Sequence, residues 1–330
     1  MSVTGPSGDE TVGGPPPLGE AAPSTQRSFL VPSALEGERA DRALALLSGR
    51  SRAELAAAVA SGAVLLDGKV LASRGRRVRA GQLLEADLVE PPGPPPADPS
   101  FQPVVVYEDQ DVIVVDKPAG VAVHPGAGRR LGTLSQALLA GYPELSQVGD
   151  PSRPGIVHRL DVGTSGLLVV ARTERARVSL VDQLRTRTMG RRYAVVVLGK
   201  VEADEGVVDA PIGRSRREPT RMTVSAEGRP ARTRYRVGSR HLGPPPATYL
   251  SCTLESGRTH QVRVHLSAIG HPVAGDPRYG GGAAFGLRRP FLHADRLELL
   301  HPSTGQRLAW ASELPAELAA VLAALGAPLS

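Results

Sequence analysis

The sequence contains one cysteine, Cys252, and therefore cannot form a disulfide bond within the chain. Such cysteine usage is typical of a reducing compartment, and we expect a cytoplasmic protein. No run of about 18 apolar residues is present, which excludes an ordinary membrane-spanning helix. Residues 1–22 lack the basic and apolar segments of a secretory signal peptide, so we expect none.

Lysine is almost absent. The chain has only Lys69, Lys117 and Lys200, so nearly all of its positive charge comes from arginine. The formal net charge is +6 and the pI is about 9.9. The arginine bias has two interpretations: genomic base composition, or a need for guanidinium groups, which suit phosphate and base recognition. The basic balance weakly favours a nucleic-acid partner.

The length of 330 residues predicts two domains. Residues 1–27 are rich in Gly, Pro, Ser and Thr, and we expect a disordered tail because such a segment buries too little apolar surface. Residues 91–100 begin with Pro-Pro-Gly-Pro-Pro-Pro, which predicts a stiff linker. This linker separates a small unit, residues 28–90, from a main body, residues 101–330.

The small unit has the patterns of an α+β domain. Ser51 followed by Glu54 is typical of a helix N-terminus and predicts a helix over residues 52–60, before Gly62. Residues 63–71 predict two short strands joined by an Asp-Gly turn.

A basic cluster follows these strands. It consists of Arg74, Arg76, Arg77 and Arg79. Two interpretations are open: a solvated loop, or an edge that contacts nucleic-acid phosphates.

The main body shows many short strand patterns and few helices. The predicted strands are 104–107, 112–115, 167–170, 193–198 and 249–254, and the predicted helices are 133–139, 174–185, 260–268 and 317–325. Because the strands outnumber the helices and do not alternate regularly with them, we predict an α+β fold with a mainly antiparallel sheet.

The first candidate site is Asp161, which follows His158-Arg159-Leu160 in a Gly/Thr/Ser loop before an apolar strand. Loops held by a rigid strand often carry catalytic groups. The alternative is an Asx-turn, in which the carboxylate accepts a hydrogen bond from the backbone of Gly163 or Thr164. Local sequence alone favours the turn.

A strand-turn-helix passage carries the second group of candidates. It contains Arg258, His260, Gln261, Arg263 and His265. The two histidines are five residues apart, with no adjacent carboxylate, so the helical zinc pattern is not met. Arg258 and Arg263 could pair with a carboxylate or a phosphate, or belong to a salt-bridged surface helix.

The segment after residue 116 offers weaker candidates. Gly126, Gly128 and Gly132 have the wrong spacing for a dinucleotide fingerprint, and no βαβ unit surrounds them. Lys117 and His124 could contact a polyanion or be plain loop residues.

Tyr193 is the last candidate and begins a strand pattern after two arginines. A tyrosine in this position is usually half-buried packing. It can also stack on a nucleic-acid base.

Taken together, these segments resemble the RluA family of pseudouridine synthases, most closely the D type of the large ribosomal subunit. The resemblance rests on His158-Arg159-Leu160-Asp161, followed along the chain by Gly257-Arg258-Thr259-His260-Gln261-Val262-Arg263. The segments 107–120, 191–193 and 270–280 also match. The small unit is similar to an S4-type RNA-binding domain.

One pair of residues departs from the family pattern. The family usually has a charged pair after the aspartate, and this chain has Val162-Gly163. A phosphate contact is therefore either missing or supplied by Arg159.

The resemblance implies a pseudouridine synthase fold, with a mixed, mainly antiparallel sheet in two halves and an active-site cleft across it. The family's catalytic aspartate falls on Asp161, its active-site tyrosine on Tyr193, and the basic partner of the aspartate on Arg263, with Arg258 as the alternative. RNA contacts are expected at His124, His158, Arg159, Thr164, Arg258, His260, Gln261, Lys117, Arg74, Arg76 and Arg77.

The implied reaction breaks the C1′–N1 bond of a uridine and rejoins the base through C5, after the base has left its stack. A carboxylate could attack C1′, attack C6 or take a proton from C2′, and the sequence does not choose among these routes. The reaction needs no redox step and no group donor, so we expect no cofactor and no metal. The expected partner is large-subunit ribosomal RNA, and a monomer is the default.

Two other functions remain open. A ribosome-assembly factor could bind RNA through the same fold without catalysis. A nucleoside hydrolase usually needs a second carboxylate to activate water, and none lies next to Asp161 in the sequence.

Overall fold

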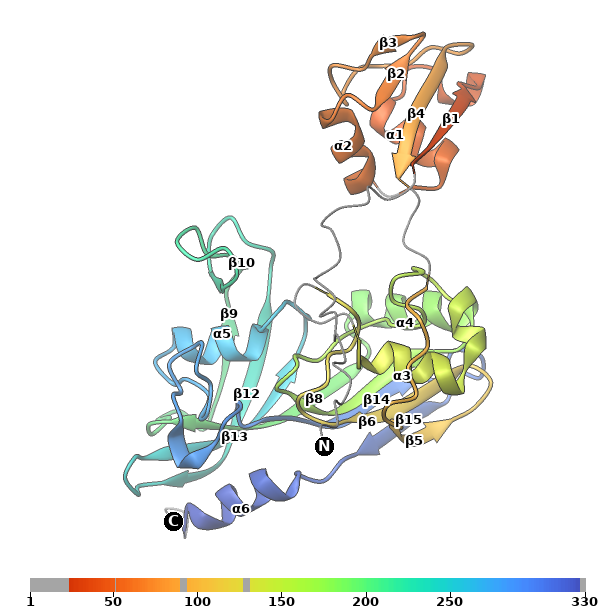
Figure 1. The fold of residues 1–330 in the computed structure, drawn as a ribbon. Coiled ribbons are helices and arrows are strands. Elements are labelled where there is room, and N and C mark those ends of the chain that lie inside the picture. The colour runs from red at the N-terminus through yellow and green to blue at the C-terminus, as the bar shows by residue number, and fades with distance from the viewer. Residues whose placement is uncertain (1–23, 51, 90–93, 127–130, 327–330) are drawn as a thin grey trace, which may run out of the picture. The chain divides into compact units, whose positions relative to one another are not determined.

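The computed structural model describes residues 24–50, 52–89, 94–126 and 131–326. The chain separates into two compact units, one ending at residue 91 and the other beginning at residue 92. Figure 1 colours the first unit red to orange and the second from yellow to blue.

The N-terminal unit packs two helices against a four-stranded antiparallel sheet with the order β1-β4-β2-β3. Its elements are β1 (Ser24–Leu30), η1 (Ser33–Leu35), α1 (Ala40–Ser48), α2 (Arg52–Ala60), β2 (Val64–Leu66), β3 (Lys69–Val70) and β4 (Leu83–Val89). Leu44 of α1, Leu55 of α2 and Leu84 of β4 have no exposed surface and form its core. Burial of such side chains contributes about 1.5–3 kcal/mol each.

The start of this unit corrects one prediction. The tail was predicted to extend to residue 27, but β1 begins at Ser24. Gln26 and Arg27 carry no apolar side chains, yet their backbones pair with Asp87 and Ala86 of β4. Backbone pairing along a sheet edge is independent of side-chain hydropathy, so composition did not reveal it. Residues 1–23 of the predicted tail and the predicted helix cap Ser51 lie outside the described residues.

The second unit is built on a nine-stranded mixed sheet. Its order is β5-β6-β7-β14-β8-β13-β12-β9, with β15 beside β14. The strands are β5 (Val104–Glu108), β6 (Val112–Lys117), β7 (Ser165–Ala171), β8 (Gly190–Leu198), β9 (Glu205–Asp209), β12 (Arg232–His241), β13 (Ala247–Leu254), β14 (Leu292–Leu300) and β15 (Arg307–Ala311). Among the described strands of this sheet, only β7 and β14 are parallel neighbours. The predicted mixed, mainly antiparallel α+β fold is confirmed.

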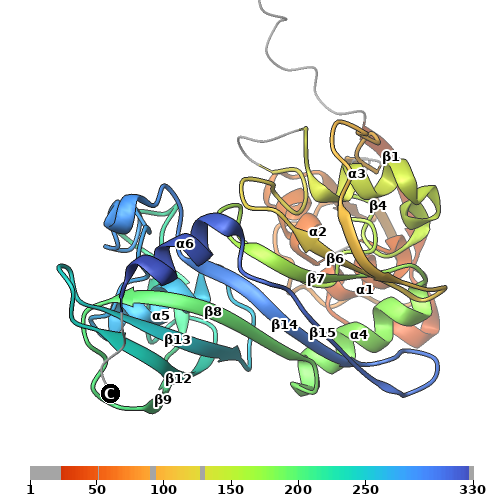
Figure 2. The same ribbon diagram turned by 90° about the horizontal axis from the view of Figure 1, so that it is seen from below.

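Helices cover both faces of this sheet. The helices are α3 (Leu134–Gly141), α4 (Glu174–Thr186), α5 (Gln261–Ala268) and α6 (Ala316–Ala324), with 3-10 turns η2 (Pro143–Gln147) and η3 (Ala284–Gly286). A separate hairpin joins β10 (Ile212–Arg214) to β11 (Met222–Val224). Figure 2 shows α6 on the near side of the sheet and α5 behind it.

Alternate residues of the central strands supply the two faces of the core. Val195 of β8 packs in one cluster with α3 and α5, whereas Val196 packs in another with α6. All seven residues of β7 are buried, as expected for a strand covered on both faces. The loop before β7 is therefore attached to the most buried part of the sheet.

The predicted linker also ends earlier than expected. Asp98 already belongs to the second unit, since its backbone N–H donates to the carbonyl of Gln136 at 3.0 Å. Its carboxylate accepts from the N–H of Gly132 at 2.9 Å. These hydrogen bonds join Asp98 to residues much later in the chain, and a proline-rich composition does not predict such contacts. Residues 90–93 of the linker region lie outside the described residues.

Candidate active site

Asp161 lies in the loop that feeds β7. The N–H of Thr164 donates to the backbone carbonyl of Asp161 at 3.0 Å, and this bond closes the turn. The Asx-turn alternative is therefore not the observed one, because the backbone and not the carboxylate accepts this bond. Gly166 anchors the loop at a φ of 113°, where a Cβ would lie 2.3 Å from the carbonyl oxygen of Ala294. Only glycine fits this close approach of β7 to β14.

Arg263 of α5 holds the Asp161 carboxylate. Its Nη1 donates to Oδ2 of Asp161 at 3.0 Å. On its other side, Nε and Nη2 donate to the two oxygens of Asp276 at 2.7 and 2.9 Å. Bidentate pairing of this kind fixes the plane of the guanidinium as well as its position.

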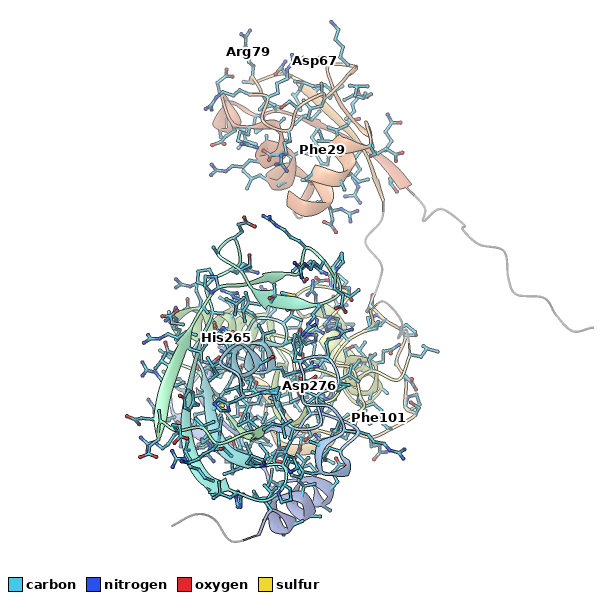
Figure 3. The ribbon with its side chains drawn as sticks, turned by 90° about the vertical axis from the view of Figure 1, so that its left-hand side faces the viewer. Phe29, Asp67, Arg79, Phe101, His265 and Asp276 are labelled. Atoms are coloured by element: carbon cyan, nitrogen blue, oxygen red, sulfur yellow. The ribbon has the colours of Figure 1, made fainter. Side chains whose placement is uncertain are left out.

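Asp276 is fully buried and lies inside the second unit (Figure 3). Its Oδ1 also accepts from the backbone N–H groups of Arg278, at 3.0 Å, and Tyr279, at 3.3 Å. Burial by itself lowers the pKa of Arg263, but hydrogen bonds and charge from Asp276, together with the charge of Asp161, raise the pKa above its ordinary value. Arg263 is therefore a permanent cation between two carboxylates.

His260 and Tyr279 close the other side of this network. Tyr279 shares a 2.8 Å hydrogen bond with Nδ1 of His260, and the Nε2 of that ring lies 3.9 Å from Oδ1 of Asp161. Burial lowers the pKa of His260, while the charge of Asp161 opposes this shift. His260 has a φ of 57°, a left-handed conformation that is uncommon outside glycine. Strain of this kind is often found at functional sites.

The network opens into a cavity of about 800 Å³. This volume lies in the range of small-molecule sites and can hold an extruded nucleotide. The wall comes from the Asp161 loop, β8, the end of β13 and the start of α5. It includes Asp161, Tyr193 and Arg263, so all three predicted catalytic residues face one space.

Tyr193 of β8 is buried beside Asp161. Burial raises the pKa of its hydroxyl, and the charges of Arg191 and Asp161 act on it in opposite directions. The tyrosine is therefore a neutral phenol at neutral pH. Its ring gives the cavity an apolar wall on which a base could stack.

Most of the predicted RNA-contact residues of this unit line the same cavity. They are His124, His158, Arg159, Thr164, Arg258, His260 and Gln261. Arg159 is exposed at the cavity edge, whereas Thr164 is buried. Burial, followed by the nearby charge of Arg191, lowers the pKa of His158 to about 3, so this ring is neutral.

Two predicted contacts need correction. Lys117 is fully buried, and its Nζ donates to the carbonyls of Pro118 and Val121 at 2.8 and 2.9 Å. The prediction that Lys117 contacts RNA is wrong, because its ammonium group supports the backbone of the following loop. The sequence around Lys117, with proline and glycine after it, gives no sign that the lysine is buried.

Gln261 lines the cavity, but its amide serves the protein. Its Oε1 accepts from the Ser256 hydroxyl and the Arg258 N–H, at 2.7 and 3.0 Å. Its Nε2 donates to the Arg232 carbonyl and the Thr233 hydroxyl, at 2.9 and 3.0 Å. The prediction that Gln261 contacts RNA is replaced by a structural role, since these four bonds fix the turn that carries Arg258.

The predicted basic cluster lies in the N-terminal unit. Arg74, Arg76, Arg77 and Arg79 are all exposed, while Val78 between them is buried. Nη1 of Arg77 donates to the carbonyl of Gly37 at 2.6 Å. Figure 3 shows Arg79 pointing outward from this unit.

Sequence reasoning missed Asp276, Tyr279 and Arg191. Asp276 and Tyr279 lie in the segment 270–280, which matched the family without any residue being assigned a role. Arg191 precedes Tyr193 by two residues, a spacing that puts both side chains on one face of a strand. That spacing could have identified Arg191 as a cavity residue.

The mixed sheet and the cavity around Asp161, Tyr193 and Arg263 are those expected of a pseudouridine synthase, and comparison with known proteins agrees. The sequence matches the model of the RNA pseudouridylate synthase family over residues 111–268. It is 48% identical over 311 residues to "Ribosomal large subunit pseudouridine synthase D" of Nitrosomonas europaea, covering 89% of this chain and 86% of that one. A protein of the same name from Pseudomonas aeruginosa is 41% identical over 314 residues, covering 91% and 96%.

A solved structure also matches. "Human RNA Pseudouridylate Synthase Domain Containing 1" superposes with a TM-score of 0.54 and 28% identity, covering 67% of this chain and 86% of that one. The chain belongs to the RNA pseudouridine synthase family. Among the described residues, none of the helices has the length and apolar composition that a bilayer span requires.

Proposed function

We propose that the chain converts uridines of the large-subunit ribosomal RNA to pseudouridine, with Asp161 as the nucleophile. The observation that carries this proposal is the position of Asp161 in the cavity. One carboxylate oxygen is held by Arg263 at 3.0 Å. The other makes no side-chain hydrogen bond to a described residue, and Nε2 of His260 lies 3.9 Å from it. It is therefore available to a substrate.

The geometry suits an ionised nucleophile in a cavity partly shielded from water. The Asp161 side chain is 17% exposed, and the permanently charged guanidinium of Arg263 binds its carboxylate. Asp276 binds the other nitrogens of the Arg263 guanidinium, so the Arg263–Asp161 pair is preorganised before substrate binds.

The reaction then follows from the residues around the base. The uridine leaves its stack and enters the cavity, where Tyr193 offers a stacking surface. The C1′–N1 bond breaks and a C1′–C5 bond forms, while C5 loses a proton and N1 gains one. Attack of Asp161 at C1′ or C6, or proton removal at C2′, all remain compatible with this position. Because burial raises the pKa of its hydroxyl and keeps it protonated, Tyr193 is assigned the stacking role and not the removal of the C5 proton.

The arginines at the cavity edge and the N-terminal unit are proposed to hold the RNA backbone. Arg159 and Arg258 lie at the cavity, and Arg74, Arg76 and Arg77 are exposed on the first unit. Contacts of this type bind phosphates without reading sequence, so affinity should fall steeply with salt. The similarity of residues 28–90 to S4-type domains supports the same role. Ribosomal RNA as substrate would place the enzyme in the cytoplasm.

The relatives' names support large-subunit RNA as the substrate, because two of them are called large-subunit synthases. The test is tritium release from RNA labelled at C5 of uridine. We expect release by the wild type on a large-subunit transcript and none by Asp161→Asn. Retained release by Asp161→Asn would exclude the assigned nucleophile, and no release by the wild type would favour the RNA-binding assembly factor.

A further inference from the structure

Arg191 is a buried cation without a partner. Arg191 is 7% exposed and lines the cavity. Its Nε has no hydrogen-bond partner, and no hydrogen bond or ion pair joins the guanidinium to any other described residue. Burial lowers the pKa of Arg191, which is the expected response of a charge removed from water. Buried charges in native proteins are normally paired, so this exception needs an explanation.

The acids near this part of the cavity are already engaged. Asp161 is bound by Arg263 at 3.0 Å. Glu255 also lines the cavity, but it is paired with Arg187 at 3.3 Å and with two further arginines on β12. No described acid on the cavity wall therefore neutralises Arg191.

The position of Arg191 is fixed by the strand and by a glycine. Arg191 and Tyr193 are two residues apart on β8, so both side chains point to the same face of the sheet. Arg192 points to the other face, where its Nη2 pairs with Asp295 at 2.6 Å. A Cβ at Gly257 would lie 2.8 Å from Nη1 of Arg191, so the guanidinium packs directly against a residue without a side chain.

His158 supplies a second unused donor on the same wall. Its Nε2 accepts from the N–H of Val169 at 3.2 Å, so in the neutral ring the proton is assigned to Nδ1. That Nδ1 is buried and has no partner in the described part of the chain. The charge of Arg191 contributes to the low pKa of His158, which means that the two groups are close.

We propose that Arg191, with the Nδ1–H of His158, binds a phosphodiester group of the RNA next to the extruded uridine. This inference rests on the proposed function and adds a phosphate subsite to its cavity. A phosphate is an anion with several acceptor oxygens, and it satisfies both the charge and the open donors. A uracil carbonyl would accept a hydrogen bond but leave the charge unneutralised. Strand geometry separates the backbone positions of Arg191 and Tyr193 by about 7 Å along β8, so a phosphate at Arg191 belongs to a nucleotide next to the one that stacks on Tyr193.

The test is the salt dependence of binding to an unmodified large-subunit RNA transcript. The variants are Arg191→Met, Arg191→Lys and, as matched control, Arg192→Met, which removes the same charge from the opposite face of the same strand. We expect the slope of log K against log salt to fall by about 1 in Arg191→Met and its affinity to drop about tenfold or more. Arg191→Lys should keep the slope, and Arg192→Met should keep both slope and affinity.

Thermal unfolding without RNA separates this role from a structural one. Removal of an unpaired buried charge should leave the melting temperature of Arg191→Met equal to that of the wild type or higher. An Arg191→Met variant that unfolds or melts lower than Arg192→Met overturns the proposal. So does an unchanged salt slope, including the case in which affinity falls, which would indicate a neutral acceptor. Tritium release by the wild type on the same transcript tests the proposed function independently.

Discussion

Two groups of carboxylates in the second unit have opposite surroundings. Asp109 and Asp111 lie in the turn between β5 and β6, where hydrogen bonds occupy all four of their carboxylate oxygens. Oδ1 of Asp109 accepts from the N–H groups of Asp111 and Val112, and Oδ2 from the hydroxyl of Tyr107 and Nε2 of His301. Asp161, in the cavity, has one oxygen bound and one open.

The second acid of the turn is held just as completely. Asp111 accepts from Thr173 and Arg175 at the start of α4, at 3.3 and 3.2 Å, and from the hydroxyl of Ser303. The pair thus ties three loops together. Burial raises the pKa of each acid, but the hydrogen bonds outweigh it, and both pKa values end below the ordinary value. A fully occupied carboxylate stabilises a fold, whereas a carboxylate fixed on one side only remains available for chemistry.

The most direct test of this comparison replaces one carboxylate oxygen by an amide nitrogen, first in Asp161 and then in Asp111. We expect Asp161→Asn to lower kcat by about 10⁴-fold or more, because a nucleophile has no substitute. Asp111→Asn should keep near wild-type kcat per folded molecule. Tritium release from labelled RNA measures both, with the folded fraction determined by circular dichroism. Equal losses in the two variants would mean that the distinction between the carboxylates is wrong.

Asp276→Asn should have the next largest effect. The change removes the charge of the fully buried Asp276 and weakens its bidentate bond with Arg263. We expect a stability loss of about 3–5 kcal/mol and a fall in kcat of about 100-fold, since small displacements of a catalytic partner are costly. Urea unfolding and tritium release measure the two.

The matched control is Asp182→Asn, which removes an exposed carboxylate paired with Arg185. It should change stability by less than about 1 kcal/mol and leave kcat unchanged. An Asp276 variant that behaves like this control would show that Arg263 does not depend on its second carboxylate.

Some strands of this unit could be predicted from sequence and others could not, whatever their place in the sheet: the edge strand β5 was predicted and the central strand β14 was not. The apolar segment of β7 and the helix α4 have clear periodicities, and both formed near the predicted bounds. Strands β9 and β12 are rich in charged residues. In β12 these occupy alternate positions, such as Arg234 and Arg236, which face outward. Strand β12 pairs with β9 on one side and with β13 on the other, and no local pattern reports that pairing.

The site shows the same division. Asp161 and Arg263 were predicted from motifs that lie 102 residues apart, and the structure brings them within 3.0 Å. Asp276 and Arg191 were not predicted, because their roles depend on what they contact or fail to contact in three dimensions. Lys117 was mistaken for a ligand residue for the same reason, since burial of a lysine cannot be read from its neighbours.

A smaller effect is expected for the stability of the turn. Asp111→Asn replaces a carboxylate that is 5% exposed and receives bonds from Arg175 and Ser303. Loss of the charge-assisted part of these bonds should cost about 1–3 kcal/mol at pH 7. Urea unfolding measures the difference. A stability loss smaller than that of the exposed Asp182→Asn variant would mean that the Asp111 carboxylate does not stabilise the fold.

The smallest effect is the pH dependence of that same difference. Because the pKa of Asp111 is lower in the folded protein, its contribution to stability is fully present above the ordinary pKa of 3.8 and is lost as pH falls through the folded value. The gap in unfolding free energy between wild type and Asp111→Asn should therefore be constant from pH 7 to about 5 and shrink below pH 4. Urea titrations at several pH values measure this gap. A gap that widens on acidification would mean that the folded protein binds the proton more tightly than the unfolded chain, which the surrounding donors do not allow.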